Sequence, residues 1–169
     1  MSRPRKILVA DDSAIIREML RMMLATEGYQ VIFAEDGQQA VEMAATEKPD
    51  LVIADGLMPK LHGFLACKAI KELEDAPRVV LLTGVYTKPS YKWEVKKDYG
   101  ADDLLTKPVK QDALIDCVKK QLATLPPWED KIAFADLADG IDLTDQIAPP
   151  AGLVFTSTQA SIPLPGSHR

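Results

Sequence analysis

Three short apolar runs in this chain are each followed by charged side chains. The pattern recurs at residues 7–10 before Asp11 and Asp12, at 51–54 before Asp55, and at 104–105 before Thr106 and Lys107. If these runs are parallel strands, the charged groups emerge together at the edge of the sheet where the strands end. Like charges that lie so close together need a compensating cation. The pattern therefore indicates a divalent metal and phosphate chemistry.

Predicted strands and helices alternate up to about residue 125. Short apolar runs predict strands over 6–10, 30–34, 51–54, 79–82 and 103–106. Apolar residues at helical spacing predict helices over 15–24, 40–45, 64–74, 89–99 and 111–125. This order is typical of an α/β fold, a doubly wound five-stranded parallel sheet flanked by five helices. Ligands of such sheets bind beyond the carboxyl ends of the strands.

Several residues mark the predicted ends of elements. Ser13 is expected to cap the first helix, and Pro49 to stop the second. Asp36 and Gly37 are read as a turn, and Asp36 taken alone is read as a helix cap in preference to a functional residue. Asp55 differs from acidic residues that merely cap helices, because it follows a fully apolar strand and precedes a loop too long for capping.

The composition changes near residue 125. We assign residues 1–125 to one domain and residues 126–169 to a Pro-rich tail, which begins with Pro126 and Pro127. A short amphipathic pattern indicates a helix near 131–141, and the tail is too small to form a second domain. No internal repeat is present.

Charge and hydropathy exclude several classes of protein. The net charge of −5 disfavours a general nucleic-acid binder. No apolar run approaches the ~20 residues of a membrane helix, and the first apolar run is too short for a signal peptide. We expect a cytoplasmic protein with neither nucleic acid nor membrane as partner. Cys67 and Cys117 lie in helical patterns at no metal-binding or redox spacing, which predicts buried free thiols.

Four groups of residues together resemble the receiver domain of bacterial two-component response regulators, of the chemotaxis-type single-domain kind. They are the pair Asp11-Asp12, the segment 55–59 followed by Gly63, the pair Thr83-Gly84, and the segment 100–103 that leads to Lys107-Pro108. The resemblance covers roughly residues 5–125. It rests on the whole set, because one acidic pair or one Lys-Pro pair alone carries no information.

The resemblance implies a magnesium site. Asp12 and Asp55 would bind Mg²⁺ directly together with the backbone carbonyl of Leu57, and Asp11 would act mostly through water. The chemistry of these groups agrees, because Mg²⁺ prefers a few hard oxygen ligands from protein and completes its shell with water.

The resemblance also implies a phosphoacceptor. Asp55 would accept a phosphoryl group from a histidine kinase or phosphotransfer protein, Thr83 would hydrogen-bond a phosphoryl oxygen, and Lys107 would pair with one. A carboxylate can act as nucleophile toward phosphorus, and the transferred group needs cations and donors around its oxygens. The resemblance further implies a cis Lys107–Pro108 peptide.

One position departs from the family's usual pattern, and two others bear on how long a phosphoryl group would last. The residue three before Lys107 is usually an aromatic switch residue, and here it is Leu104. This leaves a second function open, a phosphorylation-independent interaction module that keeps the acidic pocket. Leu57 and Val85 are both apolar at the two positions that set how water reaches an acyl phosphate. We therefore expect slow autodephosphorylation.

The expected output is protein–protein contact rather than enzyme activity. Leu57 stands where aspartate-nucleophile phosphatases need a second aspartate, so that class fails. We expect a downstream partner to bind helix 89–99, strand 103–106 and helix 111–125, or the tail. Helix 89–99 also combines lysines with Tyr91 and Trp93, which fits an acidic partner or nucleic acid, although a solvated face is favoured.

Overall fold

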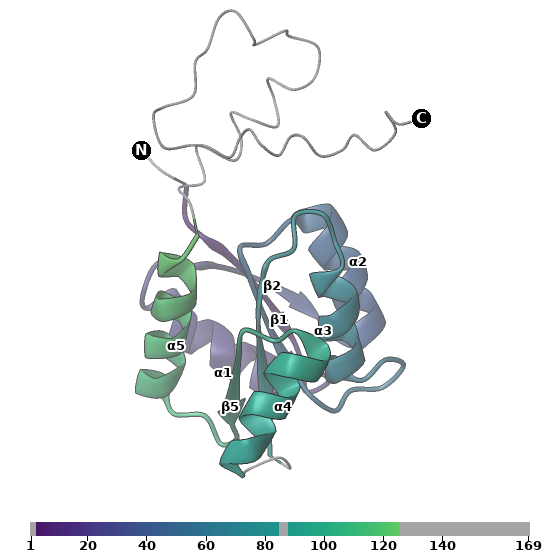
Figure 1. Cartoon of the computed structure of the whole chain (residues 1–169). Coiled ribbons are helices and arrows are strands. Elements are labelled where there is room, and N and C mark those ends of the chain that lie inside the picture. Colours follow the sequence, from purple (N-terminus) through teal and green to yellow (C-terminus); the bar gives the residue numbers. More distant parts are fainter. Residues whose placement is uncertain (1–2, 85–87, 126–169) are drawn as a thin grey trace, which may run out of the picture. The chain divides into compact units, whose positions relative to one another are not determined.

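Five parallel strands form one sheet in the order β2-β1-β3-β4-β5 (Figure 1). The computed structural model describes residues 3–84 and 88–125. The strands are β1 (Lys6–Ala10), β2 (Gln30–Ala34), β3 (Leu51–Asp55), β4 (Arg78–Thr83) and β5 (Asp103–Thr106). The order reverses between β1 and β3, so the sheet is doubly wound as predicted, and its switch point lies where these two strands end.

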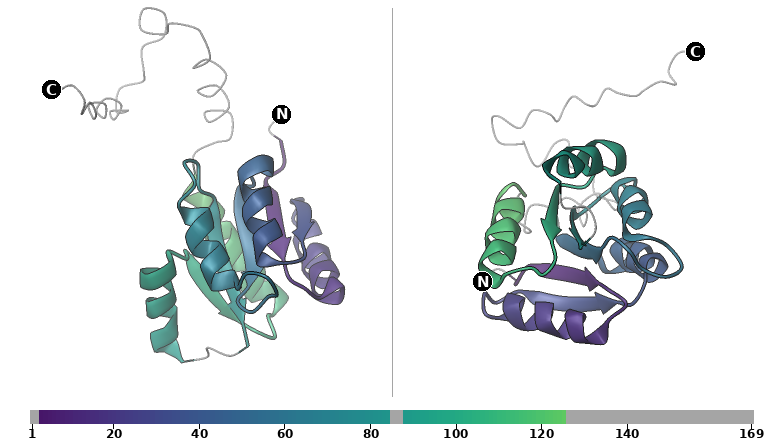
Figure 2. Two further views of the ribbon diagram at one scale, coloured as in Figure 1. Left: turned by 90° about the vertical axis from the view of Figure 1, so that its right-hand side faces the viewer. Right: turned by 90° about the horizontal axis from the view of Figure 1, so that it is seen from below.

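Five helices cover the two faces of the sheet. They are α1 (Ala14–Ala25), α2 (Gly37–Glu47), α3 (Gly63–Lys71), α4 (Pro89–Tyr99) and α5 (Gln111–Ala123). Helices α1 and α5 pack on one face, and α2, α3 and α4 pack on the other (Figure 2). None of the described helices is long and apolar enough to cross a membrane.

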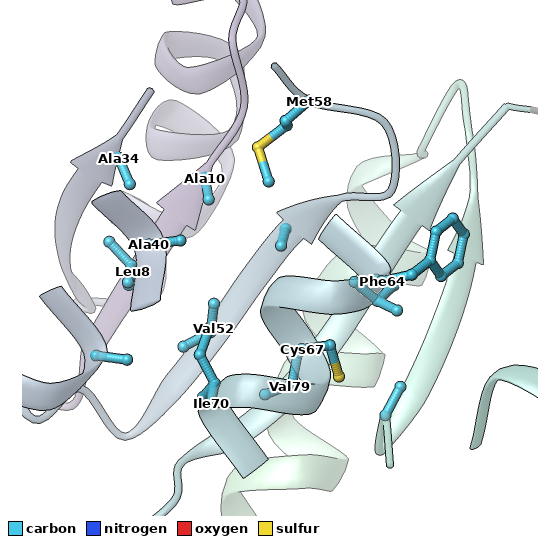
Figure 3. Close-up of a cluster of buried hydrophobic side chains, with 14 of the residues drawn as sticks. Leu8, Ala10, Ala34, Ala40, Val52, Met58, Phe64, Cys67, Ile70 and Val79 are labelled. Carbon is cyan, nitrogen blue, oxygen red and sulfur yellow. The ribbon is translucent and has the colours of Figure 1, made fainter. Parts of the chain in front are cut away.

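Two apolar clusters, one on each face of the sheet, form the core. Alternate residues of β1 point to opposite faces, with Ile7 and Val9 under α1 and α5 and Leu8 and Ala10 under α2 and α3. Figure 3 shows the second cluster, in which side chains of α2 and α3 meet those of β1 and β3. Each large apolar side chain that is fully buried contributes roughly 1.5–3 kcal/mol. This burial holds the strand ends in register.

The ends of the elements confirm some predictions and correct others. Ser13 caps α1, and its hydroxyl accepts a hydrogen bond from the Ile16 amide at 3.4 Å. The turn predicted at Asp36 and Gly37 is wrong, because α2 begins at Gly37. The helix cap predicted at Asp36 is confirmed, since its carboxylate accepts from the Gln39 amide at 2.8 Å. A short acidic side chain before a glycine fits an N-cap as well as a turn, which explains the error.

Other predictions concern the cysteines and the tail. Cys67 and Cys117 are buried free thiols, as predicted. The predicted helix near 131–141 and the rest of the tail lie outside the described residues. The division at residue 125 therefore stays a prediction.

Candidate functional site: an acidic pocket at the carboxyl edge of the sheet

Three aspartates meet where β1 and β3 end. One carboxylate oxygen from each of Asp11, Asp12 and Asp55 lies within 4.8 Å of the other two. Asp11 is almost fully buried, Asp55 is partly buried and Asp12 is exposed. The strand register aligns Ala10 with Ala54, so the residues that follow them emerge side by side. The convergence predicted from the three apolar runs is therefore present in the fold.

Lys107 brings the opposite charge to this pocket from the end of β5. Its Nζ lies 3.1 Å from Asp11 Oδ2 and 3.3 Å from Asp55 Oδ1. Its amide donates to the Thr83 carbonyl at 2.8 Å, and the Lys107–Pro108 peptide is cis, as the resemblance implied. One cation thus bridges two of the three carboxylates, which leaves an excess of negative charge among the described residues of the pocket.

The backbone around Asp55 is closely packed. A Cβ on Gly63 would lie 1.9 Å from the Asp55 carbonyl oxygen, so only glycine lets the start of α3 approach β3. A Cβ on Gly56 would lie 2.8 Å from the ring of Phe64, which therefore covers the residue after Asp55. These contacts fix the position of the Asp55 main chain.

Asp11 is held by groups on several elements. Its Oδ1 accepts from the Ser13 amide at 2.8 Å, and its carbonyl accepts from Arg17 Nη1 at 2.7 Å. Arg17 Nη2 also lies 3.5 Å from a carboxylate oxygen of Glu35. Sequence analysis missed Arg17. Its only signal was a cation five residues after Asp12, in the first turn of the helix, and such a cation is common on exposed helices.

The crowding of charges changes proton affinities. Burial raises the pKa of the Asp55 carboxyl above its ordinary value, and the charge of Asp11 adds to the rise while Lys107 opposes it. Burial works to lower the pKa of Lys107, but its hydrogen bond with Asp11 and the charges of Asp11 and Asp55 raise it overall. Lys107 is therefore a cation at neutral pH, and the ionised form of Asp55 is destabilised relative to an aspartate in water.

The donors in this pocket fit a hard divalent cation. Three carboxylates with oxygens within 4.8 Å of one another match the all-oxygen coordination of Mg²⁺. A cation here would also relieve the excess charge that Lys107 leaves uncompensated. The exposure of Asp12 leaves room for water, which Mg²⁺ keeps in most protein sites.

The structure also describes three other residues that the sequence analysis singled out, Thr83, Leu57 and Leu104. Thr83 is buried at the end of β4, beside the position that pairs with Asp55. The Leu57 amide donates to Asp55 Oδ1 at 3.4 Å, and the role predicted for the Leu57 carbonyl stays a prediction. Leu104 is buried in the core cluster that also contains Phe64 and Val95. Val85 lies outside the described residues.

Comparison with known proteins agrees with this geometry. The response regulator receiver domain matches residues 7–119. Response regulator MprA of Mycolicibacterium vanbaalenii is 35% identical over 125 residues, which are 73% of this chain and 53% of that protein. The alkaline phosphatase synthesis transcriptional regulatory protein PhoP of Bacillus subtilis is 38% identical over 62% of this chain and 42% of that protein. The chain thus spans about half the length of these relatives.

Solved structures give the same result. Chemotaxis protein CheY4 of Vibrio cholerae is 32% identical with a TM-score of 0.64, over 70% of this chain and 98% of that one. The response regulator domain of Thermotoga maritima CheB is 29% identical with a TM-score of 0.66, over 73% of this chain and 100% of that one. The fold, the pocket and these matches together show that the chain belongs to the response regulator receiver domain family of two-component signalling.

Proposed function

We propose that Asp55 accepts a phosphoryl group from a histidine kinase or phosphotransfer protein in a reaction that depends on Mg²⁺. Response regulators of this family act with histidine kinases and downstream partners. The observation that carries the proposal is the acidic pocket, where Asp55 lies 3.3 Å from Lys107 and next to two further aspartates. Each group there has a use in phosphoryl transfer.

The reaction needs a nucleophile, a leaving group and stabilised phosphoryl oxygens. An oxygen of the Asp55 carboxylate attacks phosphorus, the P–N bond to the donor histidine breaks, and its electron pair stays on the imidazole. Lys107 pairs with one phosphoryl oxygen, and the Thr83 hydroxyl donates to another. Asp11, Asp12, Asp55 and the Leu57 carbonyl would hold Mg²⁺, which supplies charge neutralisation for the transferring group.

A groove along α1 supports a protein as the phosphoryl donor. It has a volume of about 700 Å³ and starts at Ala14, next to Ser13 and the acidic pair. Ile15 and Met22 in its lining are 80% and 60% exposed. An apolar surface of this kind beside the phosphoacceptor fits a protein that must bring a histidine to Asp55.

Intact-mass spectrometry tests the proposal. The full chain is incubated with acetyl phosphate and Mg²⁺, and we expect one added phosphoryl group in the wild type and none in Asp55→Asn. Asp75→Asn removes an exposed carboxylate away from the pocket and is the matched control. Phosphorylation of Asp55→Asn at the wild-type rate, or none in the wild type with any donor, would overturn the assignment.

A slow loss of the phosphoryl group is part of the proposal. The Leu57 side chain is 48% exposed beside Asp55, and it has no polar group to orient an attacking water. Leu57→Asn should speed acyl phosphate decay by up to roughly a hundredfold, the lower end of the range for a side chain that assists proton transfer. Decay at the wild-type rate in Leu57→Asn would show that water reaches the phosphoryl group by another route.

Leu104 favours a second function, the interaction module that does not respond to phosphorylation. Leucine has no aromatic ring, and the Leu104 side chain is 7% exposed within the core. It therefore does not supply the aromatic residue that would rotate between an outer and an inner position. Hydrogen exchange of α4 and β5 with and without beryllofluoride and Mg²⁺ separates the two functions. Changed exchange rates support phosphorylation-controlled output, and unchanged rates at saturating beryllofluoride support the second function.

Output through the α4–β5–α5 face, or through the tail, is proposed as protein–protein contact. PhoP is a transcriptional regulatory protein by name, and this chain matches only 42% of its length. A partner other than nucleic acid therefore stays a prediction for this chain. The cytoplasmic location and the single-domain, chemotaxis-type assignment stay predictions in the same way.

A further inference from the structure

A groove between α3 and α4 lies outside the acidic pocket and has no role in phosphoryl transfer. Its volume is about 200 Å³, and its lining consists of three aromatic residues, one valine and two acids: Phe64, Tyr91, Val95, Tyr99, Glu94 and Asp98. The rings of Phe64 and Tyr99 have centroids 5.4 Å apart and are tilted by 45°. Helices α3 and α4 are neighbours on this face of the sheet (Figure 1).

Helix α4 has a different charge on each flank. Glu94 and Asp98 are one helical turn apart on the flank that lines the groove, and Lys92 on the other flank pairs with Asp103 at 2.8 Å. In residues 3–84 and 88–125 neither Glu94 nor Asp98 forms an ion pair. Like charges four residues apart destabilise a helix slightly. The groove therefore presents uncompensated negative charge beside aromatic rings.

A second groove of the same face gives a direct contrast. Its volume is about 180 Å³, and it also carries two acidic residues, Glu74 and Asp75. Its lining includes the cation Lys48 and no aromatic residue. Of these two grooves, only the one between α3 and α4 combines two acids with aromatic rings and lacks a cation in its lining.

We propose that the α3–α4 groove binds an arginine side chain presented by a partner protein. A guanidinium is planar, so it can stack on a tyrosine ring while its N–H groups donate to carboxylates. Tyr91 and Tyr99 are half-buried and offer ring surface, and Glu94 and Asp98 are exposed at the rim. Val95 is buried and forms an apolar floor for the methylene groups of the side chain.

The observations favour arginine over lysine as the side chain that binds. A lysine ammonium is compact and strongly hydrated, so it gains less from a stack of rings in a shallow groove. An acidic or phosphate-bearing ligand is excluded by the charge of the two rim residues. Binding at this groove needs no phosphoryl group on Asp55, and its test is independent of the proposed function.

The test is a titration of the full chain, labelled with ¹⁵N, with acetyl-argininamide. We expect saturable shifts of the amide resonances of α4 and of Phe64. Acetyl-citrullinamide has the same shape without the charge, and it should bind roughly fivefold more weakly or not at all. The double variant Glu94→Gln, Asp98→Asn should also lose roughly fivefold in affinity for acetyl-argininamide.

The second groove provides the matched control. The double variant Glu74→Gln, Asp75→Asn removes the same charge and should bind acetyl-argininamide as the wild type does. Shifts absent from the α3–α4 groove, equal binding of the citrulline compound, or an equal loss of affinity in both double variants would each overturn the proposal. The last result would mean that the probe responds only to net charge.

Discussion

Carboxylates at the two ends of the strands differ in how many cations pair with them. We call the side where the strands begin the amino edge and the side where they end the carboxyl edge. At the amino edge, Asp50 lies just before β3 and is 2% exposed. Its oxygens lie 3.3 Å from Arg3 Nη1 and 3.2 Å from Arg5 Nη1, and the Lys6 amide donates to it at 2.8 Å. Two cations and one amide therefore satisfy a single carboxylate.

Asp102 repeats this arrangement at the same edge, just before β5. It lies 2.9 Å from Lys71 Nζ and 3.1 Å from Arg78 Nη1, and the Val79 amide donates to it at 2.8 Å. Each of these two aspartates joins strands and loops that are distant in the sequence. Both are neutralised within the protein.

At the carboxyl edge, carboxylates outnumber the cations that pair with them. Among the described residues, Lys107 pairs with Asp11 and with Asp55, and Asp12 has no ion pair although it lies beside them. An aspartate with enough partners stabilises the fold, whereas aspartates with too few favour the binding of an external cation or of a proton. The difference between structural and functional carboxylates is thus the number of their partners rather than their burial.

The largest expected effect is the loss of a neutralised aspartate. Asp50→Ala leaves Arg3 and Arg5 without their carboxylate and the Lys6 amide without an acceptor, and it should cost about 3 kcal/mol of unfolding free energy. Asp12→Ala removes an exposed charge from a crowded pocket and should change stability by at most about 0.5 kcal/mol without Mg²⁺. Urea unfolding of both variants measures the contrast.

The exposed Asp75 is the reference for this experiment, since Asp75→Ala should leave the unfolding midpoint unchanged. If Asp12→Ala destabilises the protein as much as Asp50→Ala in the absence of Mg²⁺, then the two edges do not differ in the way described here.

Magnesium should stabilise the protein against unfolding by binding at the carboxyl edge and not at the amino edge. Binding at a concentration of 100 times Kd raises the unfolding free energy by about 2.7 kcal/mol, because the unfolded chain does not hold the site together. Asp12→Ala should lose most of this gain, and Asp75→Ala should keep it. The shift of thermal midpoint with Mg²⁺ concentration measures the effect. A full Mg²⁺ response in Asp12→Ala would place the cation elsewhere.

The sequence was enough to predict the pocket but not the pairing of charges. Asp11 and Lys107 follow a strand and Asp55 ends one, and parallel strands bring such residues to one edge whatever their distance in the chain. Lys92 and Asp103 pair across α4 and β5, and no periodicity encodes such a contact because it depends on how the helix is rotated. The ion pairs of Asp50 and Asp102 at the amino edge were not predicted for the same reason.

Local signals failed where two conformations use the same residues. Asp36 and Gly37 suit a turn and the start of a helix equally, and only packing of α2 on the sheet decides. Two predicted helices, 64–74 and 111–125, also extend too far toward the C-terminus, since α3 ends at Lys71 and α5 ends at Ala123. An apolar stripe continues past the last helical hydrogen bond because the following loop also covers the core.

The pH dependence of Asp55 gives a smaller effect with a definite sign. Its pKa in the fold is raised, so the ionised carboxylate costs stability at pH values above that pKa, and the cost disappears as the pH falls through it. Asp55→Asn should therefore be more stable than the wild type at pH 7 without Mg²⁺, by up to about 1 kcal/mol. Lys107 stays charged over this range and keeps its contact with Asp11.

Urea unfolding at a series of pH values from 7 to 4 checks this prediction. The advantage of Asp55→Asn should shrink toward the acid end, because the wild-type carboxyl becomes protonated there. An advantage that grows as the pH falls would mean that the pKa of Asp55 is lowered in the fold, and that Lys107 alone satisfies its charge.

The smallest effect concerns an aspartate between the two extremes. Asp103 has one cation, Lys92 at 2.8 Å, and it also accepts from its neighbour's amide and from the Cys117 thiol. Burial opposes ionisation of Asp103, but the hydrogen bonds of Lys92 and the Leu104 amide lower its pKa overall. A lowered pKa contributes stability above the pKa of the unfolded state, and this stability is lost as the pH falls through the pKa of the fold.

Lys92→Met should thus cost about 0.5–1 kcal/mol at pH 7, because half of the lysine side chain is exposed to solvent. The difference from the wild type should hold down to the pKa of an aspartate in the unfolded chain, about 3.9, and should close as the pH falls further through the lowered pKa of Asp103. Lys96→Met is the matched control, since Lys96 is an exposed lysine of the same helix with no ion pair in the described residues. Equal losses in the two variants would mean that the helix responds to its net charge, and that one cation adds nothing to a buried carboxylate already held by two hydrogen bonds.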